Sequence, residues 1–231
     1  MKAITRREFI ITGSVLAGVA ASCLTPGSGV LSASKAHAAR VDFPESNCGP
    51  KNKAGKKVLV AYASYCGTTG GVAEAIGRVF CDAGVDTDIR LVKNVDDVSA
   101  YSAVVVGSAV RSTSWYPEAI EFVRKHRQTL SGIPVAYFLT CLALYEDSEA
   151  GRKVAQSYMD PVLNAVPDVR PLDTGLFPGV LDYGKMNMMI RMVMKSKMKS
   201  KGVPEGDFRD WNAISSWAGG LPSRLVGTGT I

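Results

Sequence analysis

The chain has 231 residues, of which 46% are apolar and 21% are charged, so it can bury a full core and is not a disordered tail. Its net charge of +6 is concentrated in residues 1–38 and 185–201, and no nucleic-acid-binding motif accompanies it, so the charge does not indicate a nucleic-acid partner. The five cysteines form no CxxC pair and share no metal-ligand spacing with the two histidines, which predicts no metal site.

The first 38 residues have the three-part layout of an export signal. Arg6 and Arg7 precede an apolar run over residues 9–24, which a Pro-Gly-Ser-Gly turn follows. This run is shorter than the roughly 20 residues that span a bilayer, which argues against a membrane anchor. The arginine pair, with Phe9 two positions on, resembles the twin-arginine family of signals, whose machinery moves folded proteins. The resemblance implies export to the periplasm or another extracytoplasmic space.

The sequence is compatible with two alternative positions for the end of this signal. The residues around Ala38 suit cleavage before Ala39, whereas residues 20–23 resemble a lipoprotein box, which would place a lipid on Cys23. Residues 39–56 are rich in Ser, Gly, Pro and Lys, which predicts a flexible linker. In an exported protein Cys48 could form a disulfide. Cys81 is expected to lie buried on a helix that faces a sheet.

From residue 57 onward, strand and helix patterns alternate with short connections. The expected strands are 58–63, 86–92, 103–107, 134–140 and 169–176. The expected helices are 72–83, one that begins at Pro117, one that Ser148 caps and that runs to about 164, and 208–218. This order predicts an α/β fold of the doubly wound type, a five-stranded parallel sheet with helices on both faces. Such sheets bind ligands beyond the carboxyl ends of their strands, which directs attention to the loops after strands one, three and four.

The loop after the first strand has the chemistry of a phosphate site. It consists of Ser64, Tyr65, Cys66, Gly67, Thr68 and Thr69. Its hydroxyl groups can donate to phosphate oxygens, Gly67 lets the backbone turn closely, and the loop leads into a helix N-terminus that favours an anion. Neither a GKS or GKT sequence nor a GxGxxG sequence is present, so an ATPase loop and a dinucleotide site are both disfavoured.

The spacing S-x-x-G-x-T directly after an apolar strand resembles the FMN phosphate loop of the flavodoxins. Residues 104–134 and 177–197, with Asp210-Trp211, resemble the menaquinone-dependent protoporphyrinogen dehydrogenase branch. The resemblance covers roughly residues 57–220. It implies a flavodoxin-like FMN-binding domain over residues 57–225, with an insert at 179–206.

The same resemblance implies which residues surround the cofactor, with residues 64–69 holding the FMN phosphate. The loops along the two sides of the flavin ring would be Ser108, Ala109, Val110 and Arg111 onward to Trp115 and Tyr116, and Thr140, Cys141, Leu142 and Ala143. Trp115 is the candidate for stacking on the flavin, because aromatic faces pair well with a flat ring; the alternative is a helix-start residue packed on the surface. These loops contain Arg111 and no carboxylate, which should favour two-electron chemistry.

The insert is basic and rich in methionine. Six of the eight methionines of the chain lie between residues 186 and 198, and residues 185–201 hold six Lys and Arg residues without an acid. As a helix, this segment is expected to place Met186, Met189, Ile190 and Val193 on one face. Such a surface suits a quinone, a tetrapyrrole, a partner protein or, through Lys185 to Lys201, an anionic membrane. The alternative is a helix packed against the domain with solvated lysines.

Three functions are compatible with this sequence. The leading hypothesis is an exported FMN-dependent oxidoreductase that passes electrons to or from a quinone or a redox partner. A second is a protoporphyrinogen IX dehydrogenase in the strict sense, against which the export signal counts because haem precursors are normally oxidised on the cytoplasmic side. A third is a flavin-free binding module, against which the intact Ser64, Gly67 and Thr69 count. No set of histidine, carboxylate and nucleophile supports a hydrolase.

Overall fold

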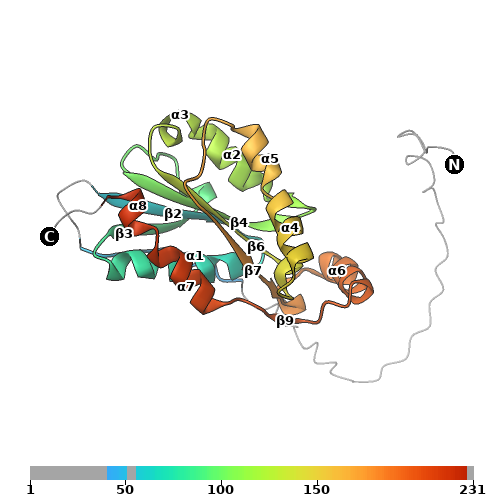
Figure 1. Cartoon of the computed structure of the whole chain (residues 1–231). Helices are drawn as coiled ribbons and strands as arrows, with labels where there is room; N and C mark the ends of the chain where they lie inside the picture. Colours follow the sequence, from blue (N-terminus) through green and yellow to red (C-terminus); the bar gives the residue numbers. More distant parts are fainter. Residues whose placement is uncertain (1–40, 51–55, 228–231) are drawn as a thin grey trace, which may run out of the picture. The chain divides into compact units, whose positions relative to one another are not determined.

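A parallel sheet forms the centre of the protein in the computed structural model, which describes residues 41–50 and 56–227 (Figure 1). Its strands are β2 (Lys57–Ala63), β3 (Asp86–Leu91), β4 (Ala103–Arg111), β6 (Val135–Cys141) and β7 (Thr174–Pro178). They lie in the order β3-β2-β4-β6-β7, and each neighbouring pair is parallel. The first parallel strand, β2, thus lies inside the second, β3, which is the doubly wound order. The predicted fold class is confirmed.

The helices cover both faces of this sheet, as Figure 1 shows. One face packs against α2 (Pro117–Lys125), α3 (Arg127–Leu130), α4 (Glu149–Ser157) and α5 (Asp160–Ala165). The other packs against α1 (Thr68–Asp82), α7 (Trp211–Gly219) and α8 (Pro222–Leu225). Because both faces are covered, the central strands read as continuous apolar runs, and residues 58–63 of β2 are all buried.

Several element boundaries differ from those expected. Ser148 does cap α4, since its hydroxyl accepts from the amide of Gly151 at 3.1 Å, but that helix ends at Ser157 and Pro161 belongs to the separate helix α5. The fifth parallel strand starts at Thr174 rather than at 169, because Pro171 has no amide hydrogen for the ladder. The last long helix starts at Trp211 rather than at 208, because the carboxylate of Asp210 caps it through the amide of Ala213.

The segment expected to be a linker contains ordered structure. Strand β1 (Ser46–Cys48) pairs antiparallel with β3 at the edge of the sheet. A disulfide joins Cys48 to Cys81 near the end of α1. Cys81 is therefore partly exposed and bonded to the edge strand, and the expectation that it lies buried against the sheet is wrong. The predicted export signal and Cys23 lie outside the described residues.

The insert forms its own small unit. It contains β8 (Val180–Leu181) paired with β9 (Gly206–Asp207), the short 3-10 helix η3 (Tyr183–Lys185), and α6 (Met188–Ser200). Met198 is buried with Leu181 and Val203, and this contact holds α6 to the unit. No helix within residues 41–50 and 56–227 is long and apolar enough to cross a membrane.

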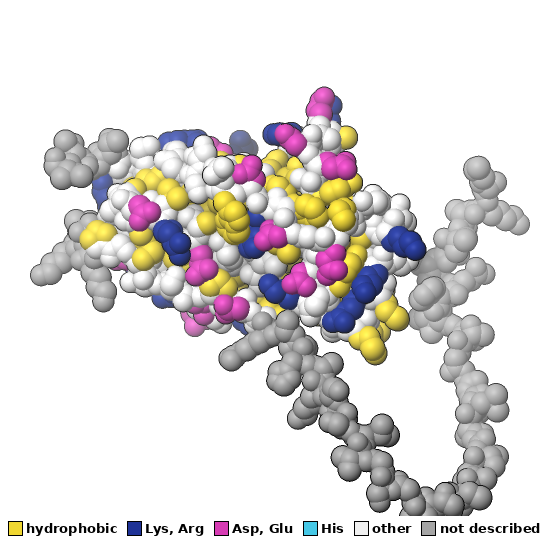
Figure 2. Space-filling view, turned by 90° about the horizontal axis from the view of Figure 1, so that it is seen from below, with side chains coloured by type: hydrophobic (Ala, Val, Ile, Leu, Met, Phe, Trp, Pro, Cys, Tyr) yellow, Lys and Arg dark blue, Asp and Glu magenta, His cyan; other side chains and the backbone are white. Residues whose placement is uncertain are grey.

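The outward face of α6 is apolar. Its exposed large side chains are Met188, Met189, Met192 and Val193, each at least 66% exposed. The expected face of Met186, Met189, Ile190 and Val193 is wrong in part, because Met186 and Ile190 are partly buried. Figure 2 shows basic and hydrophobic side chains side by side at the end of the molecule where α6 lies.

Candidate functional site

The phosphate loop lies between β2 and α1, at the carboxyl end of the sheet. Gly67 is the N-cap of α1 and has a φ of +75°, a left-handed conformation that glycine adopts freely. Within the described residues no side chain caps this helix, and its first turn carries no acid. Its free amide groups and its dipole are therefore available to an anion.

Ser64 provides the test of whether a phosphate fits this loop. Its Oγ atom is buried and finds no hydrogen-bond partner among residues 41–50 and 56–227. A buried hydroxyl without a partner is costly, and a phosphate oxygen would remove that cost. The open helix terminus and this hydroxyl lie in one loop, so the residues present fit a terminal phosphate.

Thr69, which was expected to contact the phosphate, has a protein side chain as its neighbour. Its hydroxyl lies 3.0 Å from the hydroxyl of Thr140, and both side chains are buried. This contact joins the phosphate loop to the end of β6, so two of the three predicted loops are brought together. Thr69 therefore fixes the relative position of the loops, in addition to any contact that it makes with a phosphate.

The predicted loop after the third strand is largely part of that strand. Ser108, Ala109, Val110 and Arg111 are the last four residues of β4, which turns back through positive φ angles at residues 112–113 into β5 (Ser114–Trp115). The hydroxyl of Ser108 is buried and accepts from the amide of Tyr116 at 2.9 Å. This bond fixes the returning chain, and it leaves Arg111 exposed at the tip.

Trp115 is a core residue. Its ring is 1% exposed and packs edge-on against Tyr137, with 5.0 Å between the ring centroids. Its indole N–H is buried without a hydrogen-bond partner in the part of the chain that is described. The ring has no free face for a flavin in this arrangement, so the structure does not support Trp115 as the stacking residue. The physical reason is the tight β4–β5 turn, which directs the side chain into the core.

Tyr116 takes the position nearer the site. Burial raises the pKa of its phenol to about 12, with a further contribution from the neighbouring Cys66, so the hydroxyl stays protonated at neutral pH. Arg111 and Tyr65 are also among its electrostatic neighbours, and Tyr65 is 39% exposed. Tyr116 and Tyr65 thus lie close enough to interact electrostatically beside the phosphate loop.

The third predicted loop is short. Thr140 and Cys141 end β6, and Leu142 and Ala143 lie in the 3-10 helix η2 (Leu142–Leu144). Burial raises the pKa of the Cys141 thiol to about 11, so it is neutral at physiological pH. The carbonyl of Cys141 accepts from the amide of Gly179 at 3.0 Å, which ties this loop to the start of the insert.

The insert contacts the phosphate loop directly, which the sequence analysis did not predict. The amide of Asn187 donates to the Tyr65 hydroxyl at 2.7 Å, and the Cys66 thiol donates to the carbonyl of Lys185 at 3.7 Å. Burial raises the pKa of the Cys66 thiol, as does Asp182, while Lys185 opposes the rise. A carboxylate thus does approach the site, paired with Lys185 at 4.0 Å. No sequence signal places Asn187 there, beyond its role as N-cap of α6.

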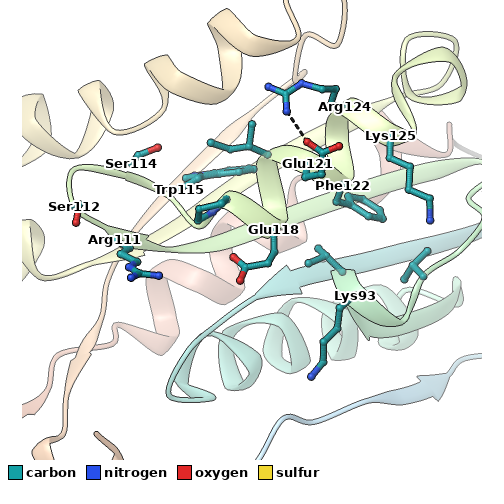
Figure 3. Close-up of a pocket in the computed structure, with 14 residues that line it drawn as sticks. Lys93, Arg111, Ser112, Ser114, Trp115, Glu118, Glu121, Phe122, Arg124 and Lys125 are labelled. Carbon is teal, nitrogen blue, oxygen red and sulfur yellow. Dashed lines mark hydrogen bonds and ion pairs between the residues drawn. The ribbon is translucent and has the colours of Figure 1, made fainter. Parts of the chain in front are cut away.

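A separate cavity of about 930 Å³ lies along α2, as Figure 3 shows. Lys93, Arg111, Trp115 and Phe122 are among its lining residues, and Glu121 and Arg124 form an ion pair at its wall. No residue of the phosphate loop lines it, and the two sites share only the turn from Arg111 to Trp115. The loop at Ser64 and Gly67, rather than this cavity, has the chemistry of a phosphate site.

Comparison with known proteins identifies the family. Residues 59–206 match the family described as Flavodoxin domain. The chain is similar to a protein from Escherichia coli K12 named protoporphyrinogen IX dehydrogenase [quinone], with 23% identity over 170 residues, 70% of this chain and 92% of that protein. A protein of the same name from Leishmania major is 24% identical over 173 residues, 70% of this chain and 73% of that protein. Two-electron reduced Megasphaera elsdenii flavodoxin matches with a TM-score of 0.44 and 18% identity, over 71% of this chain and 99% of that one.

The family match covers more than half of the chain and includes the phosphate loop, the last five residues of β2, the other four parallel strands and the whole insert. This match indicates FMN as the cofactor, in agreement with the fit of a terminal phosphate at Ser64 and α1. The chain belongs to the flavodoxin domain family.

Proposed function

We propose that this chain is an exported FMN oxidoreductase that passes electrons to or from a quinone or a redox partner. The flavodoxin domain and the distant relationship to the two dehydrogenases support an FMN flavoprotein oxidoreductase. The observation that carries the proposal is the buried, unpartnered hydroxyl of Ser64 beside the uncapped start of α1, as far as residues 41–50 and 56–227 are concerned. When bound, FMN supplies a centre that accepts and releases two electrons.

The residues of the chain have separate tasks toward this cofactor. Ser64, Gly67 and the first amides of α1 bind the phosphate, while the contact of Thr69 with Thr140 holds two loops in register. In this proposal Tyr116, whose phenol stays neutral, and the exposed Arg111 lie beside the flavin ring. A site of this charge stabilises an anionic reduced cofactor better than one surrounded by unpaired acids.

Export by the twin-arginine route is part of the proposal. FMN can then be inserted before export, where the nucleotide is made, and the folded holoprotein carries it across. The test is a precursor with Arg6→Lys and Arg7→Lys. The double variant should accumulate in the cytoplasm with FMN bound, and normal export of the variant would contradict the twin-arginine route.

The strict protoporphyrinogen IX dehydrogenase is the second candidate, favoured by the similarity to proteins of that name, which spans 92% of the Escherichia coli protein. The two candidates are distinguished by steady-state oxidation of protoporphyrinogen IX with a menaquinone analogue as acceptor. The proposed function expects the reduced protein to be reoxidised by the quinone while the tetrapyrrole is not turned over. Efficient turnover of the tetrapyrrole would favour the second candidate, and no reaction with any quinone would contradict the quinone part of the first.

The outward face of α6 is the proposed contact with an anionic membrane. Four apolar side chains, Met188, Met189, Met192 and Val193, are exposed on it, and the following turns carry Lys195, Lys197 and Lys199, also exposed. An amphipathic helix of this composition lies at a lipid surface, with its apolar side in the headgroup region and its lysines near anionic lipids. Because Asn187 at the start of α6 contacts Tyr65, such docking places the flavin site close to membrane-dissolved quinone.

A further inference from the structure

The N-terminal strap, residues 41–48, crosses the phosphate loop from the outside. A β-carbon on Gly67 would lie 2.0 Å from the carbonyl oxygen of Asp42, and one on Gly70 would lie 2.6 Å from the ring of Pro44. The strap therefore rests directly on the backbone of the loop and of the first turn of α1. The family match begins at residue 59, so the strap is an addition to the matched domain.

Hydrogen bonds attach the strap to the carboxyl ends of β2 and β3. The hydroxyl of Tyr62 donates to the carbonyl of Pro44 at 2.9 Å. The carboxylate of Glu45 accepts from the amide of Leu91 and from the side chain of Asn94, both at 2.9 Å. These contacts hold the strap close to the phosphate loop, at the end of the sheet that carries the site.

The far end of the strap is attached by a covalent bond. Strand β1 forms a ladder of only three residue pairs with β3, and a ladder of this length is marginal without further support. The disulfide between Cys48 and Cys81 supplies that support, because it ties β1 to the C-terminal end of α1. The strap thus touches α1 at its start through Pro44 and at its end through Cys48.

We propose that the N-terminal strap is a redox-dependent wall of the FMN phosphate site, closed by the Cys48–Cys81 disulfide. The closed strap supports the backbone of residues 67–70 in the conformation that binds the phosphate, so less ordering is needed when FMN binds. Closure converts two thiols to one disulfide and transfers two electrons and two protons to an oxidised dithiol, of the kind found outside the cytoplasm. Reduction by a dithiol reverses this step, frees the strap and weakens the hold on FMN.

The proposal rests on FMN being bound at the phosphate loop, and the experiment separates the two claims. Mature holoprotein is compared with and without a phosphine reductant, with mass spectrometry confirming the state of Cys48 and Cys81. We expect FMN, followed by the recovery of its fluorescence on dissociation, to leave the reduced protein about tenfold faster. The matched control is the variant Cys48→Ser with Cys81→Ser, which should release FMN quickly whether or not the reductant is present.

Hydrogen exchange of the strap in the apoprotein supplies a second measurement that does not depend on the cofactor. Residues 41–48 should exchange faster after reduction, while β4 at the centre of the sheet should not change. Equal FMN release in both redox states, with the disulfide shown to be reduced, would overturn the proposal. So would unchanged exchange of the strap in the wild-type apoprotein. A protein that binds no FMN in either redox state would contradict the cofactor assignment. The exchange measurement alone would then test whether the disulfide holds the strap in place.

Discussion

Ser64 allows cofactor binding to be separated from folding at the scale of a single residue. Its hydroxyl has no partner to lose within the described residues, so Ser64→Ala removes a phosphate contact and no contact within the fold. We expect FMN affinity to fall by about 1–3 kcal/mol, the usual effect of losing a hydrogen bond to a charged group. The melting temperature of the apoprotein should stay the same or rise. Titration of apoprotein with FMN and thermal unfolding measure the two effects.

Thr69→Val is the matched comparison for Ser64→Ala. It removes a hydroxyl of the same loop, but leaves the buried hydroxyl of Thr140 without its partner at 3.0 Å. This variant should therefore lower both FMN affinity and apoprotein stability. If Ser64→Ala bound FMN as tightly as the wild type, Ser64 would not be a phosphate ligand.

Asp88 links the stability of the strap region to pH. Its buried carboxylate accepts from Asn47 at 2.6 Å and Tyr101 at 2.7 Å, and it pairs with Lys57 at 2.8 Å. Burial alone would raise the pKa of Asp88, but the hydrogen bonds from Lys57, Asn47 and Tyr101 outweigh it and lower the pKa. A lowered folded-state pKa means that this stabilisation is complete above the ordinary carboxyl pKa of about 4 and is lost as the pH falls through the folded-state value.

We therefore expect Asp88→Asn to reduce the free energy of unfolding by about 1–2 kcal/mol at pH 7, a modest figure because Lys57 is partly exposed to solvent. The difference from the wild type should shrink as the pH is lowered below about 4, where the wild-type carboxyl takes up its proton. Urea unfolding of both proteins at several pH values measures this. A difference that stays constant down to pH 3 would contradict the assignment of Asp88.

At the scale of elements, the sequence predicts those helices and strands that their own local residue pattern is sufficient to specify. The apolar run of β2 and the cap of α4 at Ser148 are local features, and the structure confirms both. Strand β1 could not be predicted, because three residues of mixed polarity become a strand only through the edge of β3 and the bond to Cys81. Trp115 was misjudged for a similar reason, since a turn at residues 112–113 with positive φ values sets the direction of its side chain.

In the site, too, local features could be predicted from the sequence and contacts between distant segments could not. The phosphate loop was recognisable because its residues are consecutive and adjoin a strand and a helix. The contacts of Asn187 and Lys185 with this loop depend on how the insert folds back over more than a hundred residues. Their pairing with the loop carries no local sequence signal.

Helix α6 is the element that tests membrane docking. Changing Lys195, Lys197, Lys199 and Lys201 to Gln should leave FMN content unchanged and weaken binding to anionic vesicles, because each lysine near an anionic surface contributes about 1 kcal/mol. The loss should be largest at low ionic strength, where screening is weakest.

The matched control for α6 removes the same charge elsewhere. Its four positions, Lys93, Lys125, Arg152 and Lys153, are exposed and lie outside the insert. This control should keep most of the vesicle binding, and sedimentation with vesicles of defined phosphatidylglycerol content compares the variants. If the wild-type protein does not bind such vesicles, or if both variants lose vesicle binding equally, the docking proposal is contradicted. Helix α6 would then be a solvated helix packed on the domain.

At the scale of the whole molecule, three parts of the chain converge on one end of the sheet. The phosphate loop, the N-terminal strap and the insert all meet at the carboxyl ends of the parallel strands. This is where a doubly wound sheet binds its ligand, so the strap, which lies outside the matched domain, and the insert, which lies within it, are both next to the proposed cofactor site.

The most direct test of this account is the visible spectrum of the purified mature protein together with the mass of the cofactor released from it. The account predicts a yellow protein with flavin absorption that releases FMN in a ratio of about one per chain, with a site that needs only a single terminal phosphate. Release of FAD, or a colourless protein that FMN cannot reconstitute, would contradict it.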